Sequence, residues 1–196
     1  LHGHVDAVRA LAAKGADVNV LDASGHTLIH LACSNGHLET AKALRGLGIA
    51  LDASDEAGRT AMHIACGDGH LTTARWLSED GKLPFDGADA TGARPLHYAC
   101  AAGDEPTVRW LLEAGASVSG ATSEGNTPLH HACQCGSIPM AEALLAAGAS
   151  SNATNADGDT PFLLSCFGGH VDLCKRLAAS AGGAASSSGG SGDGGL

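Results

Sequence analysis

The sequence predicts an all-α solenoid, a single file of stacked helix-turn-helix units. Three observations predict it: one segment returns about every 33 residues, apolar residues recur in fixed columns, and helix-starting and helix-stopping residues punctuate each copy. A fixed period of this size indicates units that are each too small to bury their own apolar face. The segment begins at regularly spaced glycines, which are Gly25, Gly58, Gly92, Gly125 and Gly158.

The clearest copy shows how each unit forms. The Thr127 hydroxyl is suited to capping a helix, and proline at the first helical position gives up only an amide that would be unpaired there. A short helix is therefore expected from about Pro128 to Gln134, with Gly136 as a left-handed stop. A second helix should follow from about Pro139 to Ala147 and end at Gly148, and the polar residues after it indicate an extended turn into the next copy.

Matching positions of the copies carry side chains of matching size. The second-helix column is leucine in every copy, comprising Leu11, Leu44, Leu77, Leu111, Leu144 and Leu177. A small column in the first helix comprises Ala32, Ala65, Ala99, Ala132 and Ser165. Small side chains let neighbouring helices approach closely, while the leucines fill the space between units. Truncating one of these leucines to alanine should therefore cost about 2–5 kcal/mol.

The seven cysteines follow the same register. One first-helix column comprises Cys33, Cys66, Cys100, Cys133 and Cys166, and we expect these thiols to be small buried hydrophobes. Cys135 lies outside the column and is expected to be partly exposed. An odd number of thiols without a secretory signal favours a reducing compartment, so the cytoplasm is the predicted location, with the nucleus as an alternative.

These features resemble the ankyrin repeat family. The resemblance is carried by the box Thr127-Pro128-Leu129-His130, the turns Gly36-His37 and Gly69-His70, and the ending Leu111-Leu112-Glu113-Ala114-Gly115-Ala116. It extends over roughly residues 3–181. The resemblance implies an ankyrin repeat solenoid, an L-shaped stack of helix pairs with projecting β-hairpin loops, which binds other proteins and carries out no catalysis.

The register divides the chain into repeats and a tail. Residues 1–21 are the C-terminal half of a truncated repeat, followed by repeats over 22–54, 55–88, 89–121 and 122–153, a degenerate terminal repeat over 154–181, and a Gly/Ser-rich disordered tail or linker over 182–196. Because the opening half-repeat lacks its first helix, Val5, Val8 and Leu11 should be exposed. We therefore expect further repeats upstream in a parent chain.

Three positions depart from the repeat pattern. Arg94 replaces the capping threonine of the third copy, which should weaken that helix start. Leu163 replaces the box histidine of the last copy, as expected for a terminal unit. One residue is inserted within 83–89, in a loop where insertions are tolerated.

Charge and hydropathy exclude several kinds of partner. The net charge of −10 disfavours nucleic acid, because binding to nucleic acid depends on Lys and Arg neutralising phosphates. The same charge disfavours an anionic membrane surface. No run of about 18 apolar residues is present, so no direct membrane insertion is expected. We expect the array to be a monomer.

Most of the histidines fall into two columns. The box column comprises His30, His63, His97 and His130, and the column after the inter-helix glycine comprises His4, His37, His70 and His170. Members of one column should lie roughly 10 Å apart in stacked helices, too far to share a metal. The family resemblance implies that the box histidines form structural hydrogen bonds with the neighbouring unit. Residues that packing requires in every copy give little evidence of a unique active site, so no metal, cofactor or enzymatic activity is predicted.

Positions that vary between copies mark the candidate binding surface. They lie at the loop tips and on the exposed side of the first helices, which together form the concave face. The candidate partner-binding residues are His26, Glu56, Arg59, Asp68, Tyr98, Glu124, Asn126, His131, Gln134 and Asp159. Tyr98 and His131 are the expected anchors, because flat rings provide contact area at low entropic cost. The acidic loops favour a basic or polar segment of a partner protein; for any single position, a solvated variable side chain is the competing interpretation.

Two other functions remain open. The chain is compatible with a regulatory or targeting array of a larger multidomain enzyme, such as a kinase, acyltransferase or ubiquitin ligase, and with a structural membrane-skeleton adaptor. The family resemblance also implies a candidate asparaginyl hydroxylation at Asn19, beside Asp17-Val18 and downstream of Leu11. The competing interpretation is that Asn19 stabilises the turn.

Overall fold

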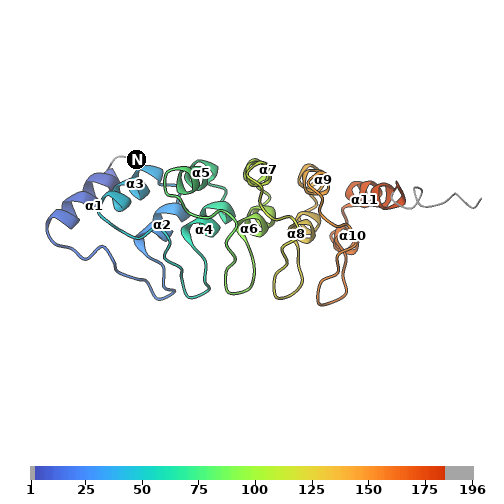
Figure 1. Cartoon of the computed structure of the whole chain (residues 1–196), viewed down its shortest axis with the longest axis horizontal. Helices are drawn as coiled ribbons and strands as arrows, with labels where there is room; N and C mark the ends of the chain where they lie inside the picture. The colour runs from blue at the N-terminus through green and yellow to red at the C-terminus, as the bar shows by residue number, and fades with distance from the viewer. Residues whose placement is uncertain (1–2, 184–196) are drawn as a thin grey trace, which may run out of the picture.

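The computed structural model describes residues 3–183, which form one elongated row of helices (Figure 1). The helices of this part are α1 (Gly3–Ala13), α2 (Leu28–Ser34), α3 (Leu38–Gly46), α4 (Ala61–Gly67), α5 (Leu71–Glu79), α6 (Pro95–Ala102), α7 (Glu105–Glu113), α8 (Pro128–Gln134), α9 (Ile138–Ala146), α10 (Pro161–Phe167) and α11 (Val171–Gly183). Within residues 3–183 there is no strand beyond an isolated bridge between Ser54 and Thr60. The fold is therefore the all-α repeat solenoid that the periodicity predicts.

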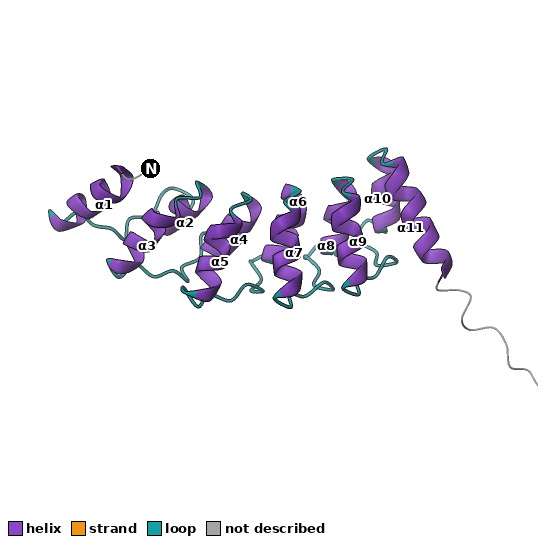
Figure 2. Ribbon diagram, turned by 90° about the horizontal axis from the view of Figure 1, so that it is seen from above, coloured by secondary structure: helices purple, strands orange, loops and turns teal. Residues whose placement is uncertain are grey.

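The helices stack in two layers (Figure 1). The first helices of the units, α2, α4, α6, α8 and α10, form one layer, in which each contacts the next. The second helices, α3, α5, α7, α9 and α11, form the other layer together with α1, and each of the five packs on the first helix of its own pair. Loops project from the first-helix layer, away from the second helices, and we call them fingers. Seen from above, the pairs follow one another side by side (Figure 2).

The helix α8 shows why the first helices are short. It begins directly after Thr127 and ends at Gln134, at the predicted bounds. The amide of Gly136 then donates a hydrogen bond back to the carbonyl oxygen of Cys133 at 3.2 Å. Gly136 has a φ of 71°, a left-handed conformation that is open to glycine at no steric cost. The glycine therefore stops the helix.

The helix α9 begins one residue before the predicted start at Pro139. The reason is that the Ser137 side chain accepts a hydrogen bond from the Met140 amide at 3.4 Å and caps the helix there. At its other end, Gly148 adopts a φ of 94° and turns the chain into the next finger, as predicted.

The inserted residue lies at the end of α5, which corrects the predicted position within 83–89. In other units the left-handed residue after the second helix is a glycine, such as Gly148, four positions after the column leucine. In this unit it is Lys82, with a φ of 60°, five positions after Leu77. The helix α5 has nine residues, as α3, α7 and α9 do, so the extra residue lengthens the turn after the helix, and the following finger keeps its ordinary length. Periodicity alone cannot distinguish these two positions, because both preserve the spacing of the fingers.

The leucine column forms the spine of the core. From Leu44 to Leu177 its members are no more than 2% exposed. At the open end of the stack Leu11 is 58% exposed, as predicted for an unpaired half-repeat. Val5 and Val8, however, are half-buried rather than exposed, because α1 packs against α3 and covers that side of the helix.

The cysteine column is buried in its first four members, namely Cys33, Cys66, Cys100 and Cys133. Burial raises the pKa of Cys33 and of Cys133 to about 12, so both remain protonated thiols at neutral pH. The prediction was wrong for Cys166, which is exposed, because no helix pair follows α10 and α11 within the described residues. Cys135 is exposed, as expected.

The third unit begins its first helix without threonine. The ring atom Nδ1 of His97 accepts a hydrogen bond from the Arg94 amide at 3.0 Å, so the histidine closes the helix start. The Arg94 guanidinium instead lies 3.1 Å from the Asp86 carboxylate. The helix α6 therefore forms despite the replacement.

At the C-terminal end, α11 continues through Gly183. The first two residues of the predicted tail, 182–183, are thus helical, and the remainder of that tail, residues 184–196, lies outside the described residues, as does His2. None of the helices between residues 3 and 183 has the length and apolar content that a bilayer span requires.

Candidate partner-binding face

The box histidines tie each unit to the finger of the next. In the fourth unit, His130 Nδ1 accepts a hydrogen bond from the Thr127 amide at 3.0 Å. Because a backbone amide can only donate, the proton of the neutral ring lies on Nε2, which donates to the carbonyl oxygen of Asp159 at 3.2 Å. His30 bonds in the same way to the carbonyl oxygen of Arg59, whereas His63 and His97 bond to those of Gly87 and Gly120, which precede the fingertip. The structural role that the family resemblance implies is therefore present.

These histidines are electrically neutral at pH 7. Burial lowers the pKa of each one, namely His30, His63, His97 and His130. Both nitrogens of each ring are occupied by structural hydrogen bonds, so the rings are poorly placed for proton transfer to a substrate. No group of three metal-ligating side chains converges in the part of the chain that the structure describes.

The fingertips are turns built on acidic, amide or hydroxyl side chains, which are Asp22, Asp55, Asp89, Thr122 and Asn155. In the second finger, Asp55 Oδ1 accepts hydrogen bonds from the amides of Ala57 and Arg59 at 3.0 and 2.8 Å. Asp55 Oδ2 lies 2.8 Å from Arg59 Nε and 3.3 Å from His26 Nε2. His26 also pairs with Asp22 through Nδ1 at 2.9 Å. Two of the predicted contact residues are therefore engaged in structural contacts: Arg59 forms an ion pair with Asp55 within the second finger, and its Nη2 lies 3.1 Å from His26 Nε2 of the first finger.

A hollow of about 270 Å³ lies between α6 and α8 and the fingers beside them, and we call it the α6–α8 hollow. Its lining comprises Thr91, Ala93, His97, Tyr98, Ala101, Thr122, Ser123, Glu124, Asn126 and His131. Small-molecule sites typically have volumes of about 300–1,000 Å³, so this space suits one or two side chains of a partner. Four predicted residues, Tyr98, Glu124, Asn126 and His131, are brought together here.

A second hollow, of about 340 Å³, lies along α2 and α4, and we call it the α2–α4 hollow. Its lining comprises His26, His30, Leu31, Ser34, Arg59, His63, Ile64, Gly67, Asp68 and Tyr98. Tyr98 lines both hollows and stands between them. The two spaces are therefore neighbouring parts of one surface, formed by first helices and fingers, which we call the finger face.

Tyr98 is held in place from three sides. Its hydroxyl donates a hydrogen bond to Asp89 Oδ2 at 2.6 Å, and its ring meets that of His63 edge-on at 5.6 Å between centroids. The absence of a side chain at Gly67 leaves room for the ring, since a Cβ there would lie 3.3 Å from Tyr98 Cδ1. Burial, together with the bond to Asp89, raises the pKa of Tyr98, so its hydroxyl stays protonated and uncharged at neutral pH. The ring is thus held in a fixed position beside both hollows.

His131 forms the other aromatic wall of the α6–α8 hollow. Burial, with a smaller contribution from the neighbouring His97, lowers its pKa to about 4. Its ring meets that of His97 edge-on, at 5.9 Å between centroids. At neutral pH the ring is therefore uncharged and offers an apolar edge to the hollow.

The remaining predicted residues divide by exposure. Glu56, Asp68, Glu124 and Gln134 are exposed. Asn126 and Asp159 are half-buried and have structural partners: Asn126 Oδ1 accepts a hydrogen bond from the Asn155 side chain at 3.1 Å, and the Asp159 carbonyl accepts one from His130. Glu56, Gln134 and Asp159 line neither hollow.

Two apolar residues of the finger face were missed by the sequence analysis. Leu31 and Ile64 line the α2–α4 hollow, and they occupy the same position of the repeat as Tyr98 and His131. Their shared register was a signal that could have identified them. They were overlooked because Leu and Ile in an apolar column are usually core residues.

Asn19 is exposed, and its amide donates a hydrogen bond to Asp17 Oδ1 at 2.8 Å. The turn is thus stabilised by the Asp17 side chain, while hydroxylation of Asn19 stays a prediction.

Comparison with known families agrees with this geometry. The profile for ankyrin repeats in three copies matches residues 1–85 and 82–155. A second profile, for ankyrin repeats in many copies, matches residues 136–178. A search of curated proteins finds no match. The matched residues include every helix pair described above, and the chain belongs to the ankyrin repeat family.

Proposed function

We propose that this array binds a segment of a partner protein across the finger face, which corresponds to the concave face of the sequence analysis. Ankyrin repeats are generally protein–protein interaction modules without catalytic activity. The observation that carries the proposal is the pair of hollows separated by the fixed ring of Tyr98. A rigid aromatic side chain in a pre-formed groove loses little entropy on binding, which is typical of interaction hot spots.

The chemistry of the rims favours a partner segment that is basic or polar. Glu56, Asp68 and Glu124 expose carboxylates along this face, and the whole chain has a net charge of −10. Complementary charge increases the association rate and excludes acidic partners. Within the α6–α8 hollow, Ala93, Ala101 and the uncharged His131 ring favour an apolar side chain. The proposed segment therefore places an apolar residue beside Tyr98 and a basic residue near Glu124.

The thiols support a reducing compartment, such as the cytoplasm or nucleus, for this function. The four buried cysteines of the column lie on successive first helices without a disulfide, and disulfides are rare where glutathione keeps thiols reduced.

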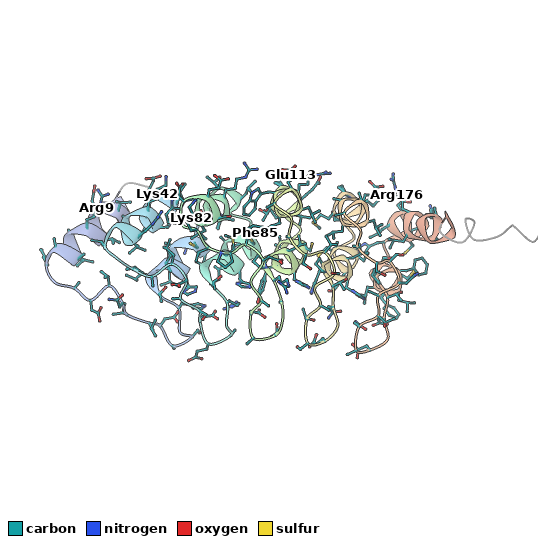
Figure 3. All side chains as sticks on the ribbon, viewed as in Figure 1. Arg9, Lys42, Lys82, Phe85, Glu113 and Arg176 are labelled. Carbon is teal, nitrogen blue, oxygen red and sulfur yellow. The ribbon has the colours of Figure 1, made fainter. Side chains whose placement is uncertain are left out.

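The test reverses the charge of one exposed glutamate on the finger face and of one exposed glutamate on the second-helix layer. Peptides that bind the immobilised full chain are first selected from a random-peptide display library. Their affinities for the wild type, Glu124→Lys and Glu113→Lys are then measured. Glu113 is exposed on α7, in the second-helix layer away from the fingers (Figure 3). We expect Glu124→Lys to weaken binding of basic peptides about tenfold, or about 1.4 kcal/mol, and Glu113→Lys to leave it unchanged.

Equal affinity of both variants for the selected peptides would show that another face binds. Because both positions are exposed, neither substitution should change the midpoint of thermal unfolding. A loss of binding can therefore be distinguished from a loss of folding. Tyr98→Ala is a weaker probe, because it also removes the bond to Asp89 and the contact with His63 and so lowers stability.

A further inference from the structure

Two cysteines of the last helix pair face each other. Cys166 Sγ on α10 lies 3.3 Å from Cys174 Sγ on α11. Both are free thiols; Cys166 is exposed and Cys174 is half-buried. The Ser165 hydroxyl lies 3.1 Å from Cys174 Sγ, within hydrogen-bond distance. The pair lies away from the finger-face hollows, in neither of which it takes part.

The other thiols of the chain are placed differently. Cys33, Cys66, Cys100 and Cys133 are buried in the column. Cys135 is exposed, but its Sγ lies 3.5 and 3.4 Å from the carbonyl oxygens of Cys100 and Ala101 rather than beside a thiol. Cys135 is therefore a natural control for Cys166, because it is accessible without a thiol neighbour.

We propose that Cys166 and Cys174 form an intramolecular disulfide when the protein meets a low-molecular-weight disulfide such as oxidised glutathione. The new bond locks α10 to α11 at the C-terminal end of the stack. In a reducing compartment such a bond is transient, and it forms when the proportion of oxidised glutathione rises.

The reaction proceeds by two thiol–disulfide exchanges. The accessible Cys166 loses its proton and attacks one sulfur of oxidised glutathione, whose disulfide breaks and releases one glutathione as a thiol after it takes up a proton. Cys174, deprotonated in turn, then attacks Cys166 Sγ in the mixed disulfide. The Sγ–Sγ bond forms and the second glutathione leaves as a thiol. The two cysteines are oxidised by two electrons, and the oxidised glutathione is reduced to two thiols.

The geometry requires little movement. The sulfurs must approach from 3.3 Å to the disulfide length of about 2.05 Å. The helices are joined by the short turn Gly168-Gly169-His170, in which Gly169 has a φ of 73°, and the outer side of α10 is exposed at Phe167. The end of the stack can therefore adjust without disturbing a following pair within the described residues.

The first test identifies the bond. The full chain is incubated with oxidised glutathione at about pH 8. This pH is chosen because the contact with Cys174 raises the pKa of Cys166, and only the thiolate attacks a disulfide. Remaining thiols are then alkylated, and the intact protein and its peptides are weighed. We expect a product that carries two alkyl groups fewer than the reduced and alkylated chain, with a peptide linking Cys166 to Cys174 and with Cys135 still alkylated.

Three variants and one control condition sharpen this test. Cys166→Ser and Cys174→Ser should each abolish the linked peptide, whereas Cys135→Ser should retain it. In strong denaturant the preference for this pair should disappear, because it depends on the fold. A stable glutathione adduct on Cys166 beside an alkylated Cys174, or a link to Cys135 in the native chain, would overturn the proposal.

The second test measures the locking. Amide hydrogen exchange of the oxidised and reduced chain is compared helix by helix. We expect exchange in α10 and α11 to slow about tenfold on oxidation, with exchange in α6 unchanged. Unchanged or faster exchange in α10 and α11 of the cross-linked chain would refute the locking of this helix pair.

Discussion

The fourth helix pair, α8 and α9, and the last pair, α10 and α11, carry matching sequence positions in different surroundings. Leu129 on α8 is fully buried, whereas its counterpart Phe162 on α10 is 38% exposed. Cys133 is buried and its counterpart Cys166 is exposed. The difference arises because α8 is packed between α6 and α10, whereas within the described residues α10 has a first-helix neighbour on one side only.

The helix starts of the two pairs differ in the same way. At α8 the histidine ring of His130 closes the start and reaches the next finger. At α10 the counterpart is Leu163, and the Thr160 hydroxyl takes over the cap by accepting a hydrogen bond from the Leu163 amide at 3.3 Å. The comparison teaches that burial in a solenoid depends on the interface between units, whereas each helix start is capped by side chains of its own unit.

The largest expected effect is in the core. Leu129→Ala should lower the free energy of unfolding by about 2–5 kcal/mol, because it opens a cavity between packed units. Phe162→Ala should cost about 1 kcal/mol, because the ring is partly in water. Urea titrations of both variants measure the contrast. Equal losses would mean that position in the repeat, rather than the neighbour, sets the energy.

The box histidine comes next. His130→Ala should cost about 2–3 kcal/mol, since it leaves the Thr127 amide and the Asp159 carbonyl without their partner. Leu163→Ala should cost about 0.5 kcal/mol, because this side chain is 39% exposed and bonds nothing across the stack. Thermal unfolding with both variants at pH 7 tests this pair, and a milder loss for His130→Ala than for Leu163→Ala would contradict the interface account.

Acidification should affect the two regions unequally. The folded-state pKa of each box histidine lies below that of the unfolded chain, so stability is fully present above about pH 6.5 and declines as the pH falls through the lower folded-state values. Amide exchange at pH 7 and pH 5, corrected for intrinsic rates, should show a greater loss of protection in α8 than in α10. A variant with His97→Gln should show a smaller decline in overall stability over this range than the wild type. If the variant and the wild type lost the same stability between pH 7 and pH 5, protonation of His97 would not be a cause of the decline.

The smallest expected effect concerns the surface between the two pairs. Arg176 on α11 forms an ion pair with Glu142 on α9. Both side chains are exposed, so Glu142→Ala should change the free energy of unfolding by about 0.5 kcal/mol or less. A urea midpoint measured at low and high salt provides the check. A loss comparable with that of Leu129→Ala would mean that surface charge, and not the core, holds the last pair.

The sequence predicted the fold well where the cause was local. The bounds of α8 follow from Thr127, Pro128 and Gly136, and the buried leucines follow from their register. The exposure of Cys166 was predicted wrongly, because it depends on whether another pair packs on α10. The place of the inserted residue was also missed, because only the backbone angle of Lys82 distinguishes a longer turn after α5 from a longer finger.

For the candidate site, the sequence identified residue types but not their associations. Tyr98 and His131 were expected at the surface, and both line a hollow. The bond from Tyr98 to Asp89 joins a helix to the finger of its own unit, and the contacts of His26 with Asp55 and Arg59 join the first finger to the second. Repeat register places such residues near each other, but the pairing depends on side-chain directions that a linear pattern does not specify.

The bonds from the box histidines have an evolutionary consequence. Their acceptors are the main-chain carbonyls of Arg59, Gly87, Gly120 and Asp159, so a basic residue, an acidic residue and two glycines serve equally. Stacking therefore requires only a correctly placed peptide group, whatever amino acid supplies it. Mutations at these finger positions can accumulate without uncoupling the units, so an ankyrin array of this kind can acquire new specificity by drift in its loops while its scaffold is inherited intact.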